Sequence, residues 1–191
     1  KAIGDGSDAF ELHARLEQTV IPPKIPDNEP KRLQELVSYG LLDTEAEAHF
    51  DDLTALAAQI CGTPIALISL VDADRQWFKS RFGLEARQTP RDVSFCGHAI
   101  HSEDMFVVED ATADERFFDN PLVVGDPSVR FYAGVPLWSP SGHALGTLCT
   151  IDSQPRTLKQ EQIDGLTRLG RVVMTYFGSR QAGLIREREA E

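Results

Sequence analysis

Residues 91–114 read RDVSFCGHAIHSEDMFVVEDATAD, and this stretch decides the fold that we predict for the chain. It combines a short predicted helix with an apolar predicted strand at 105–108, and it then turns outward through the acidic pair Asp110 and Asp114. The helix carries an aromatic ring, a thiol and two imidazoles, on Phe95, Cys96, His98 and His101. We therefore predict that this stretch forms one wall of a small-molecule pocket.

The composition of the 191-residue chain is ordinary for a globular protein, with 41% hydrophobic and 26% charged residues. Its formal net charge of -11 argues against nucleic-acid binding, because a phosphate backbone needs clustered Lys and Arg side chains. No apolar run approaches the ~20 residues that span a bilayer. The three cysteines, Cys61, Cys96 and Cys149, form no CxxC motif and predict reduced thiols in a cytoplasmic protein.

The N-terminal part is predicted to lie outside the main domain. Residues 7–19 fit a short helix, and residues 20–30, VIPPKIPDNEP, hold four prolines, which fix extended backbone and remove hydrogen-bond donors. We therefore assign residues 1–29 to an N-terminal helix and linker and residues 30–177 to one domain. Residues 178–191 are too charged to pack inside a globule and predict a helical extension toward a further domain.

Three longer helices are predicted from apolar residues at three- and four-residue spacing. The first begins at Pro30 and stops near Gly40, and the second spans 45–61 and ends at Gly62. The third opens with a capping box from Thr157 to Gln160. The apolar positions assigned to their buried faces are Leu33, Leu36 and Val37; Phe50, Leu53, Leu56, Ala57 and Ile60; and Ile163, Leu166, Leu169, Val173 and Tyr176.

The strands are predicted from apolar runs and alternation. Residues 64–71 are apolar and β-branched, as in a strand buried on both faces, while residues 75–82 alternate as a half-exposed partner in an antiparallel hairpin. Residues 130–138 and 143–152 flank the turn SPSG and predict a second hairpin, in which Pro136 indicates an irregularity or an edge.

This order of elements predicts an α+β fold with a central antiparallel sheet of about five to six strands. The terminal helices can bury their apolar stripes only on one face of that sheet. The short helix and the loops are left to cover the other face, and a ligand would sit in that layer.

The sequence resembles the GAF domain family, also described as GAF/profilin-like, over about residues 33–177. Five segments carry the resemblance and occur in the family's order: LISLVDADRQWFKSRFG (67–83), SFCGHAI (94–100), VVEDATADERFFDNPLV (107–123), RFYAGVPL (130–137) and LGTLCTIDSQPRTLKQEQ (145–162). The resemblance implies a sensory module of signalling proteins, with terminal helices behind the sheet and a pocket in front. It also implies a homodimer through the terminal helices and an attached output domain, such as a histidine kinase, a diguanylate cyclase or a phosphodiesterase.

The residues that we assign to ligand binding lie in or near the stretch 91–114 and its predicted neighbours. They are Trp77, Phe95, Cys96, His98, Asp110, Asp114, Phe117, Arg130 and Tyr132. The ligand itself is not named by the sequence. Bilin-binding members resemble this stretch in carrying a Cys on this helix, but there His follows directly, whereas Gly97 intervenes here. That departure disfavours a bilin, and nothing in the sequence points to haem.

Each of these residues also has an ordinary structural interpretation. A half-buried Cys96 that packs as a small hydrophobic residue is commoner than a covalent anchor, a haem ligand or a redox thiol, and the aromatic residues are more often core than cofactor contacts. His98 and His101 share a helix face while Cys96 lies away from it, so a three-ligand metal site is disfavoured against histidines that donate to a neighbouring carbonyl. Asp110 and Asp114 can cap the loop, and Arg130, which shares a strand face with Tyr132, is either a ligand for an anion or a rim residue.

The main hypothesis is a non-catalytic sensor in which a ligand in front of the sheet shifts the terminal helices. It depends on a void on that side of the sheet. One alternative is thiol chemistry of the kind found in the free methionine-(R)-sulfoxide reductases, which share the GAF fold. For that chemistry only Cys96 is predicted to lie near the pocket, since Cys149 is predicted to be packing within a strand. The other alternative is a ligand-free dimerisation module.

Overall fold

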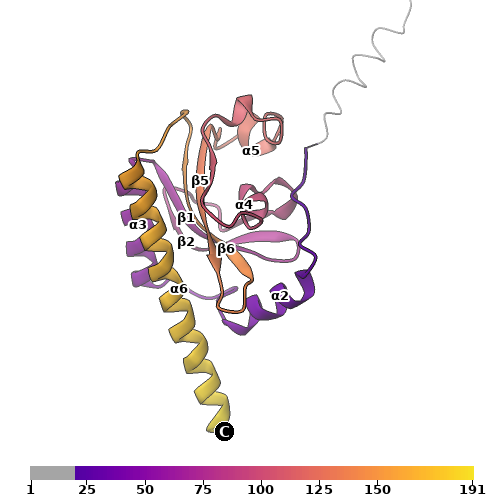
Figure 1. Cartoon of the computed structure of the whole chain (residues 1–191), viewed down its shortest axis with the longest axis vertical. Helices are drawn as coiled ribbons and strands as arrows, with labels where there is room; N and C mark the ends of the chain where they lie inside the picture. Colours follow the sequence, from indigo (N-terminus) through magenta and orange to yellow (C-terminus); the bar gives the residue numbers. More distant parts are fainter. Residues whose placement is uncertain (1–19) are drawn as a thin grey trace, which may run out of the picture.

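The computed structural model describes residues 20–191, so the helix expected at 7–19 lies outside the described residues. Its centre is a six-stranded antiparallel sheet in the order β3-β2-β1-β6-β5-β4 (Figure 1). This confirms the predicted α+β class and the upper end of the predicted strand number. The strands are β1 (Ile65–Val71), β2 (Arg75–Phe82), β3 (Gln88–Pro90), β4 (Phe106–Val108), β5 (Phe131–Trp138) and β6 (Ala144–Asp152).

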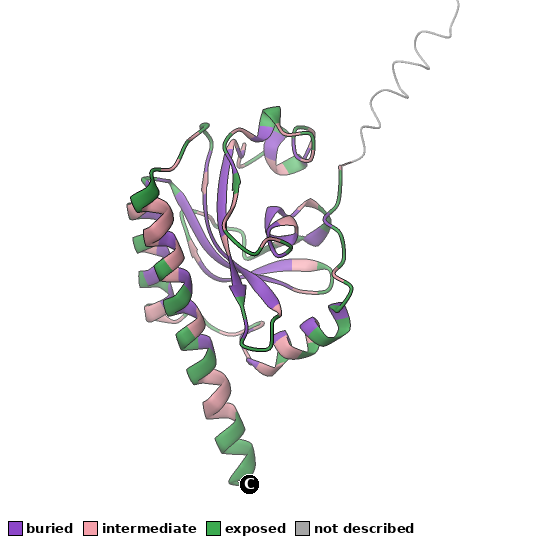
Figure 2. Cartoon of the chain, in the orientation of Figure 1, coloured by how far each residue is buried: buried purple, intermediate pink, exposed green. Residues whose placement is uncertain are grey.

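The two central strands, β1 and β6, are buried on both faces, as the apolar run at 64–71 predicts (Figure 2). They pair antiparallel from Ile65 with Ile151 to Leu70 with Gly146. Gly146 must be glycine, because a Cβ there would lie 1.9 Å from the Ser69 carbonyl oxygen. Both predicted hairpins are present, and a register shift follows Pro136 in β5, which confirms the predicted irregularity.

Two helices, α3 (Ala48–Cys61) and α6 (Gln160–Glu189), lie side by side on one face of the sheet (Figure 1). Helix α2 (Glu29–Ser38) lies instead across the end of the sheet. There Arg32 donates hydrogen bonds to the backbone carbonyls of Val71, at 2.8 Å, and Ala144, at 3.2 Å. Leu36 of α2 packs in the same core cluster as Phe50 of α3 and Phe177 of α6, so the apolar side of α2 is also buried on the helix face of the sheet, as predicted.

Three residues predicted to be buried on these helices are exposed, namely Val37, Leu56 and Tyr176. The buried stripe of α6 runs through Leu166, Gly170, Val173 and Phe177, so it is rotated by one residue at its C-terminal end. Phe177 packs its ring edge on Phe50, with ring centroids 5.5 Å apart. Residue spacing alone predicts that Tyr176 is buried. In the structure the small Gly170 lies against Val135 of the sheet, and this close approach sets which side of α6 is buried.

Strand β2 is not half-exposed as predicted, because both of its faces are covered: Trp77 lies in the core on the helix side and Phe78 lies in the front core. In addition, the register of β2 shifts opposite Ile68 and Ser69. After this shift Lys79 and Ser80 both face the helix layer. Lys79 Nζ lies 2.8 Å from Thr44 Oγ1, and Ser80 Oγ lies 2.9 Å from Thr54 Oγ1. A single-residue bulge of this kind leaves no signal in a polar-apolar pattern.

The opposite face of the sheet is covered by short elements, as predicted (Figure 1). They are a 3-10 turn at Arg91–Val93, helix α4 (Phe95–Ala99), a 3-10 turn at Ala111–Ala113 and helix α5 (Pro121–Val124). Ser94 caps α4 by accepting a hydrogen bond from the Gly97 amide at 3.1 Å. The third long helix, α6, begins later than predicted, at Gln160. The capping box is formed by Lys159 and Gln162, whose side chain accepts a hydrogen bond from the Lys159 amide, and not by Thr157 and Gln160 as predicted.

Within residues 20–191, no helix is long and apolar enough to cross a membrane. Helix α6 continues without a break to Glu189. The boundary at 177/178 between domain and extension, like the one at 29/30, stays a prediction.

Candidate functional site

The layer in front of the sheet is filled by the side chains that the sequence singled out. Phe95 and Phe117 stack with ring centroids 4.0 Å apart, and Phe95 also stacks on Tyr132 at 5.2 Å. All three rings are buried in one apolar cluster with Phe78. The sequence therefore placed Phe95, Phe117 and Tyr132 together correctly, and their contact with a ligand stays a prediction.

Cys96 points from α4 into this cluster and is 2% exposed. Its Sγ atom accepts hydrogen bonds from Tyr132 Oη and Thr147 Oγ1, both at 3.2 Å. Burial alone raises the pKa of the thiol, but hydrogen bonds from surrounding side chains outweigh burial and lower the pKa to about 6. Those side chains are Cys149, Ser69, Thr147 and Tyr132. The predicted half-buried thiol is thus fully buried and well supplied with donors.

His98 and His101 leave α4 on the side away from the sheet and hold the proline-rich segment 20–28. The Nε2 atom of His98 lies 3.2 Å from the Ile21 carbonyl oxygen, and that of His101 lies 2.8 Å from the Lys24 carbonyl oxygen. Between them Pro23 is buried against Gly97. The structural interpretation of these histidines is confirmed, and the segment predicted to be a free linker is docked along α4 (Figure 1).

The end of this segment is anchored by a buried ionic cluster. The Glu29 carboxylate pairs with both Arg32 and Arg91, and Arg91 also donates to the Asp72 carbonyl oxygen at 3.0 Å. Burial raises the pKa of Glu29, but the two guanidinium groups outweigh burial and lower it to about 2. Nothing in the sequence pattern distinguished Arg91 from a surface arginine.

The predicted polar residues of the front loop are occupied with local contacts. Asp110 accepts from the amide and hydroxyl of Thr112, and Asp114 forms a two-point ion pair with Arg116. Arg130 donates to the carbonyl oxygens of Val123 and Val129. The capping alternative therefore describes both aspartates, and Arg130 holds the loop rather than facing Tyr132.

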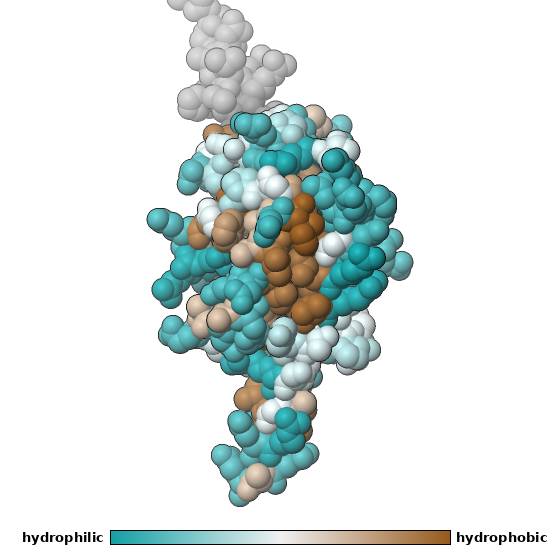
Figure 3. All heavy atoms as spheres, turned by 90° about the vertical axis from the view of Figure 1, so that its left-hand side faces the viewer, coloured by the Kyte–Doolittle hydropathy of each residue, from teal (hydrophilic) through white to brown (hydrophobic). Residues whose placement is uncertain are grey.

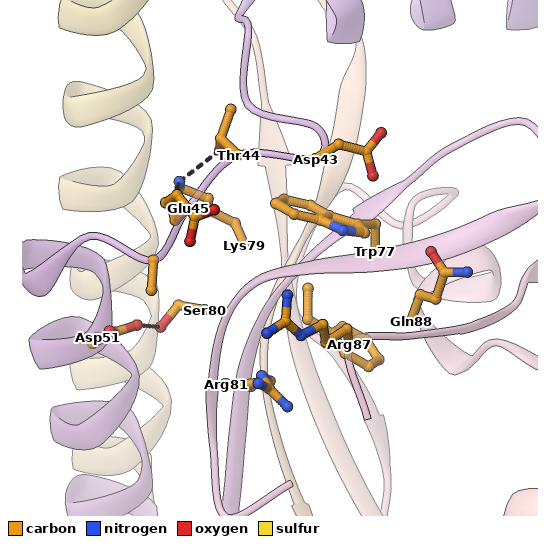
Figure 4. Close-up of a pocket in the computed structure, with 12 residues that line it drawn as sticks. Asp43, Thr44, Glu45, Asp51, Trp77, Lys79, Ser80, Arg81, Arg87 and Gln88 are labelled. Carbon is orange, nitrogen blue, oxygen red and sulfur yellow. Dashed lines mark hydrogen bonds between the residues drawn. The ribbon is translucent and has the colours of Figure 1, made fainter. Parts of the chain in front are cut away.

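The remaining predicted residue, Trp77, lines a cleft of about 650 Å³ at the β2 edge of the sheet (Figure 4). The cleft lies between the segment 43–46, the first turn of α3, and strand β2 beyond the end of β3. Its volume is within the range of small-molecule sites. Trp77 itself belongs to the core on the helix side, so the structure separates it from Phe95 and Tyr132.

Charges of both signs surround this cleft. Lys79 is fully buried at its inner wall, with Nζ bound to Thr44 Oγ1, the Glu45 carbonyl oxygen and the Glu47 carboxylate. Asp51 accepts from Ser80 at 2.6 Å (Figure 4). Arg87 is exposed at the rim, and its guanidinium makes no hydrogen bond or ion pair with another side chain of residues 20–191. The lining thus offers an indole, a free guanidinium and carboxylates to one guest.

Glu47 connects this cleft to the C-terminal helix. Its carboxylate binds Lys79 of β2 at 2.6 Å and Arg180 of α6 at 3.1 Å. Arg180 also donates to the Gly40 carbonyl oxygen at 2.9 Å. A change in the segment 43–47 therefore reaches α6 through one side chain.

Comparison with known families now identifies the domain, since the GAF domain model matches residues 45–176. The chain belongs to the GAF domain family. Among curated proteins, this GAF domain is 46% identical over 153 residues to a cyclic di-GMP phosphodiesterase of Pseudomonas aeruginosa. The match covers 80% of this chain and 26% of that enzyme, so the chain spans about a quarter of the length of its relative.

Solved structures confirm the GAF fold. The GAF domain of an Acinetobacter phosphoenolpyruvate-protein phosphotransferase superposes with a TM-score of 0.60 at 17% identity, covering 82% of this chain and 96% of that one. A free methionine-R-sulfoxide reductase of Neisseria meningitidis, in complex with its substrate, superposes with a TM-score of 0.59 at 19% identity. That match covers 84% of this chain and 96% of the reductase. At these identities the likeness concerns the fold alone.

Proposed function

We propose that this GAF domain is a non-catalytic, cytoplasmic sensor that binds a small molecule and regulates an attached domain acting on cyclic di-GMP. The observation that carries the proposal is the 46% identity to part of a cyclic di-GMP phosphodiesterase. The matched part is about a quarter of that enzyme, as expected for a regulatory domain that accompanies a separate output domain.

The ligand site that we propose is the cleft at the β2 edge rather than the front layer. The front layer is closed by the stacked rings of Phe95 and Phe117, whereas the cleft is open and bordered by the unpaired guanidinium of Arg87. A guest with an anionic group and a flat apolar part suits Arg87 and the Trp77 indole.

The signal that we propose passes through Glu47. A ligand that displaces the segment 43–47 changes the contacts of Glu47 with Lys79 and Arg180, and thereby the position of α6. Such coupling requires that the ligand bind the two positions of α6 unequally. Helix α6 is the element that leads toward the proposed output domain.

Dimerisation through α3 and α6 is part of this proposal. Figure 3 shows an apolar strip down the middle of the helix face. The exposed apolar residues on these two helices are Leu56, Val172, Tyr176 and Ile185. Apolar strips of this kind on a folded domain favour a second protein surface.

The test is cyclic di-GMP hydrolysis by the intact gene product, with and without a low-molecular-mass metabolite extract of its own cells. We expect the extract to change the wild-type rate, and Arg87→Glu to abolish the response while keeping the basal rate. Glu47→Gln is expected to bind the same metabolite but to lose the response. A wild-type rate that ignores the extract, or a response unchanged by both variants, contradicts the proposal.

A further inference from the structure

Two of the three cysteines lie together in the front core, although the sequence assigned only one of them to this region. Cys96 enters from α4, and Cys149 enters from β6. Cys149 follows Thr147 by two residues on the same strand face, and Thr147 Oγ1 is 3.2 Å from Cys96 Sγ. Both thiols belong to the same buried cluster, and each of them shifts the pKa of the other.

We propose that Cys96 and Cys149 form a reversible disulfide when the domain meets hydrogen peroxide. The pair is then a redox modification site inside the GAF domain, separate from the cleft at the β2 edge. The proposal does not depend on the ligand proposed for that cleft.

The surroundings of Cys96 favour it as the attacking thiol. Its sulfur receives two hydroxyl hydrogen bonds, from Tyr132 and Thr147, and such donors stabilise a thiolate over a thiol. The low pKa of Cys96 agrees with this geometry. Burial and the neighbouring Cys96 raise the pKa of Cys149, so Cys149 stays protonated until the second step.

The reaction balances with peroxide as the only oxidant. The Cys96 thiolate attacks one oxygen of hydrogen peroxide, an S–O bond forms, the O–O bond breaks, and hydroxide leaves and becomes water on taking up a proton. The Cys149 thiol then loses its proton and attacks the sulfenic sulfur of Cys96. The S–S bond forms, the S–O bond breaks, and the oxygen takes up the proton and leaves as a second water. Two thiols lose two electrons, and one peroxide becomes two waters.

Cys61 is a matched control that the chain itself provides. It is as deeply buried as Cys96, at 1% exposure, but it lies on α3 across the sheet and in the other apolar cluster. Burial raises the pKa of the Cys61 thiol. Depth of burial is therefore matched, whereas the neighbouring thiol and the hydrogen bonds from the Tyr132 and Thr147 hydroxyl groups distinguish Cys96 from Cys61.

The experiment treats the folded 191-residue chain with hydrogen peroxide, blocks the remaining thiols by alkylation and maps the peptides by mass spectrometry. We expect a Cys96–Cys149 linked peptide that dithiothreitol reverses, and free Cys61. In Cys149→Ser, Cys96 should stop as a sulfenic acid that dimedone traps. Cys61→Ser should behave as the wild type, and Cys96→Ser should leave Cys149 reduced.

The hydroxyl donors provide a second readout that does not depend on removing a cysteine. Thr147→Val keeps the shape of the side chain and removes one donor to sulfur. We expect the oxidation rate of Cys96 near pH 6 to fall about tenfold and its pH midpoint to move upward. Equal oxidation rates of Cys96 and Cys61, a disulfide to Cys61, or a Cys96–Cys149 link that forms only after thermal unfolding would overturn the proposal.

Discussion

His98 Nε2 lies 3.2 Å from the backbone carbonyl oxygen of Ile21 and so joins the front helix to the proline-rich segment. A carbonyl oxygen only accepts, so Nε2 carries the proton. The contact holds the segment against α4, a helix of only five residues that is itself held on the sheet by the buried side chains of Phe95, Cys96 and Ala99. Together with the contact of His101 with Lys24, it holds segment 20–28 along the front of the domain.

Removing this contact should release the segment. We expect His98→Ala to lower the free energy of unfolding by about 1 kcal/mol, the usual value of a hydrogen bond. Amide hydrogen exchange in residues 20–28 should accelerate, while exchange in β1 stays unchanged. The control is His98→Gln, whose amide nitrogen can still donate. Unchanged protection of residues 20–28 in His98→Ala would show that the segment is held without the imidazole.

Gly97 is required by the same packing. A Cβ at this position would lie 2.6 Å from Pro23 Cγ and 2.5 Å from Ser94 Oγ. We expect Gly97→Ala to destabilise the domain by about 2 kcal/mol through overpacking.

The control for Gly97→Ala is Gly178→Ala on α6, where a Cβ meets nothing within 4 Å. There the alanine should stabilise by about 0.5 to 1 kcal/mol through helix propensity. Chemical denaturation of both variants measures the two effects. If both substitutions changed the free energy of unfolding by the same amount and in the same direction, helix propensity rather than packing at Gly97 would account for the effect.

The ionic cluster of Glu29 predicts a specific pH dependence. Its pKa is lowered from 4.5 to about 2, so the stabilisation is fully present above pH 4.5 and is lost as the pH falls toward 2. Glu29→Gln should therefore lower the free energy of unfolding at pH 7 by about 3 kcal/mol, also because it leaves Arg91 buried without its counterion.

The difference between wild type and Glu29→Gln should shrink between pH 4.5 and pH 2, as followed by urea denaturation at each pH. Glu187→Gln, at an exposed position near the end of α6, serves as the control and should show no such dependence. A constant difference across this range would assign the loss to packing rather than to charge.

The helix face should hold the dimer. Val172 is 40% exposed on α6, and Val172→Glu places a charge in the proposed interface. We expect the wild type to sediment as a dimer and the variant as a monomer. Val124→Glu on α5, where the valine is 71% exposed, adds the same charge away from that face and should leave the dimer intact. A wild type that stays monomeric at high concentration contradicts this interface.

The two hairpins and the antiparallel sheet were predictable because burial leaves a direct mark on composition, whereas the strand at Gln88–Pro90 was not predicted. Every residue from Ile65 to Val71 except Ser69 is apolar, which indicates a strand buried on both faces. Gly62 adopts the left-handed backbone that ends α3. Resemblance to the GAF family then supplied the order of the layers. The strands and the helix end depend on local sequence, so they can be predicted without knowledge of the tertiary contacts.

The features that were missed arise from contacts between distant segments. Lys79, beside the bulge opposite Ile68 and Ser69, is buried, and its charge is tolerated there because the Glu47 carboxylate and oxygen atoms of Thr44 and Glu45 bind its ammonium group. Likewise, Cys149 looks like strand packing in sequence, and its proximity to Cys96 appears only once α4 lies on β6. The proline-rich segment was read as a linker because its docking depends on carbonyl oxygens, which carry no sequence signal.

The claim that the domain is a receptor is tested most directly by native mass spectrometry of the purified protein after incubation with the metabolite extract of its own cells. We predict that the wild type carries one small molecule per domain and that Arg87→Glu carries none, while Arg116→Glu on the front loop still binds. A wild type that shows only the bare protein mass, or a bound molecule that Arg87→Glu retains, would contradict a ligand site at the β2 edge.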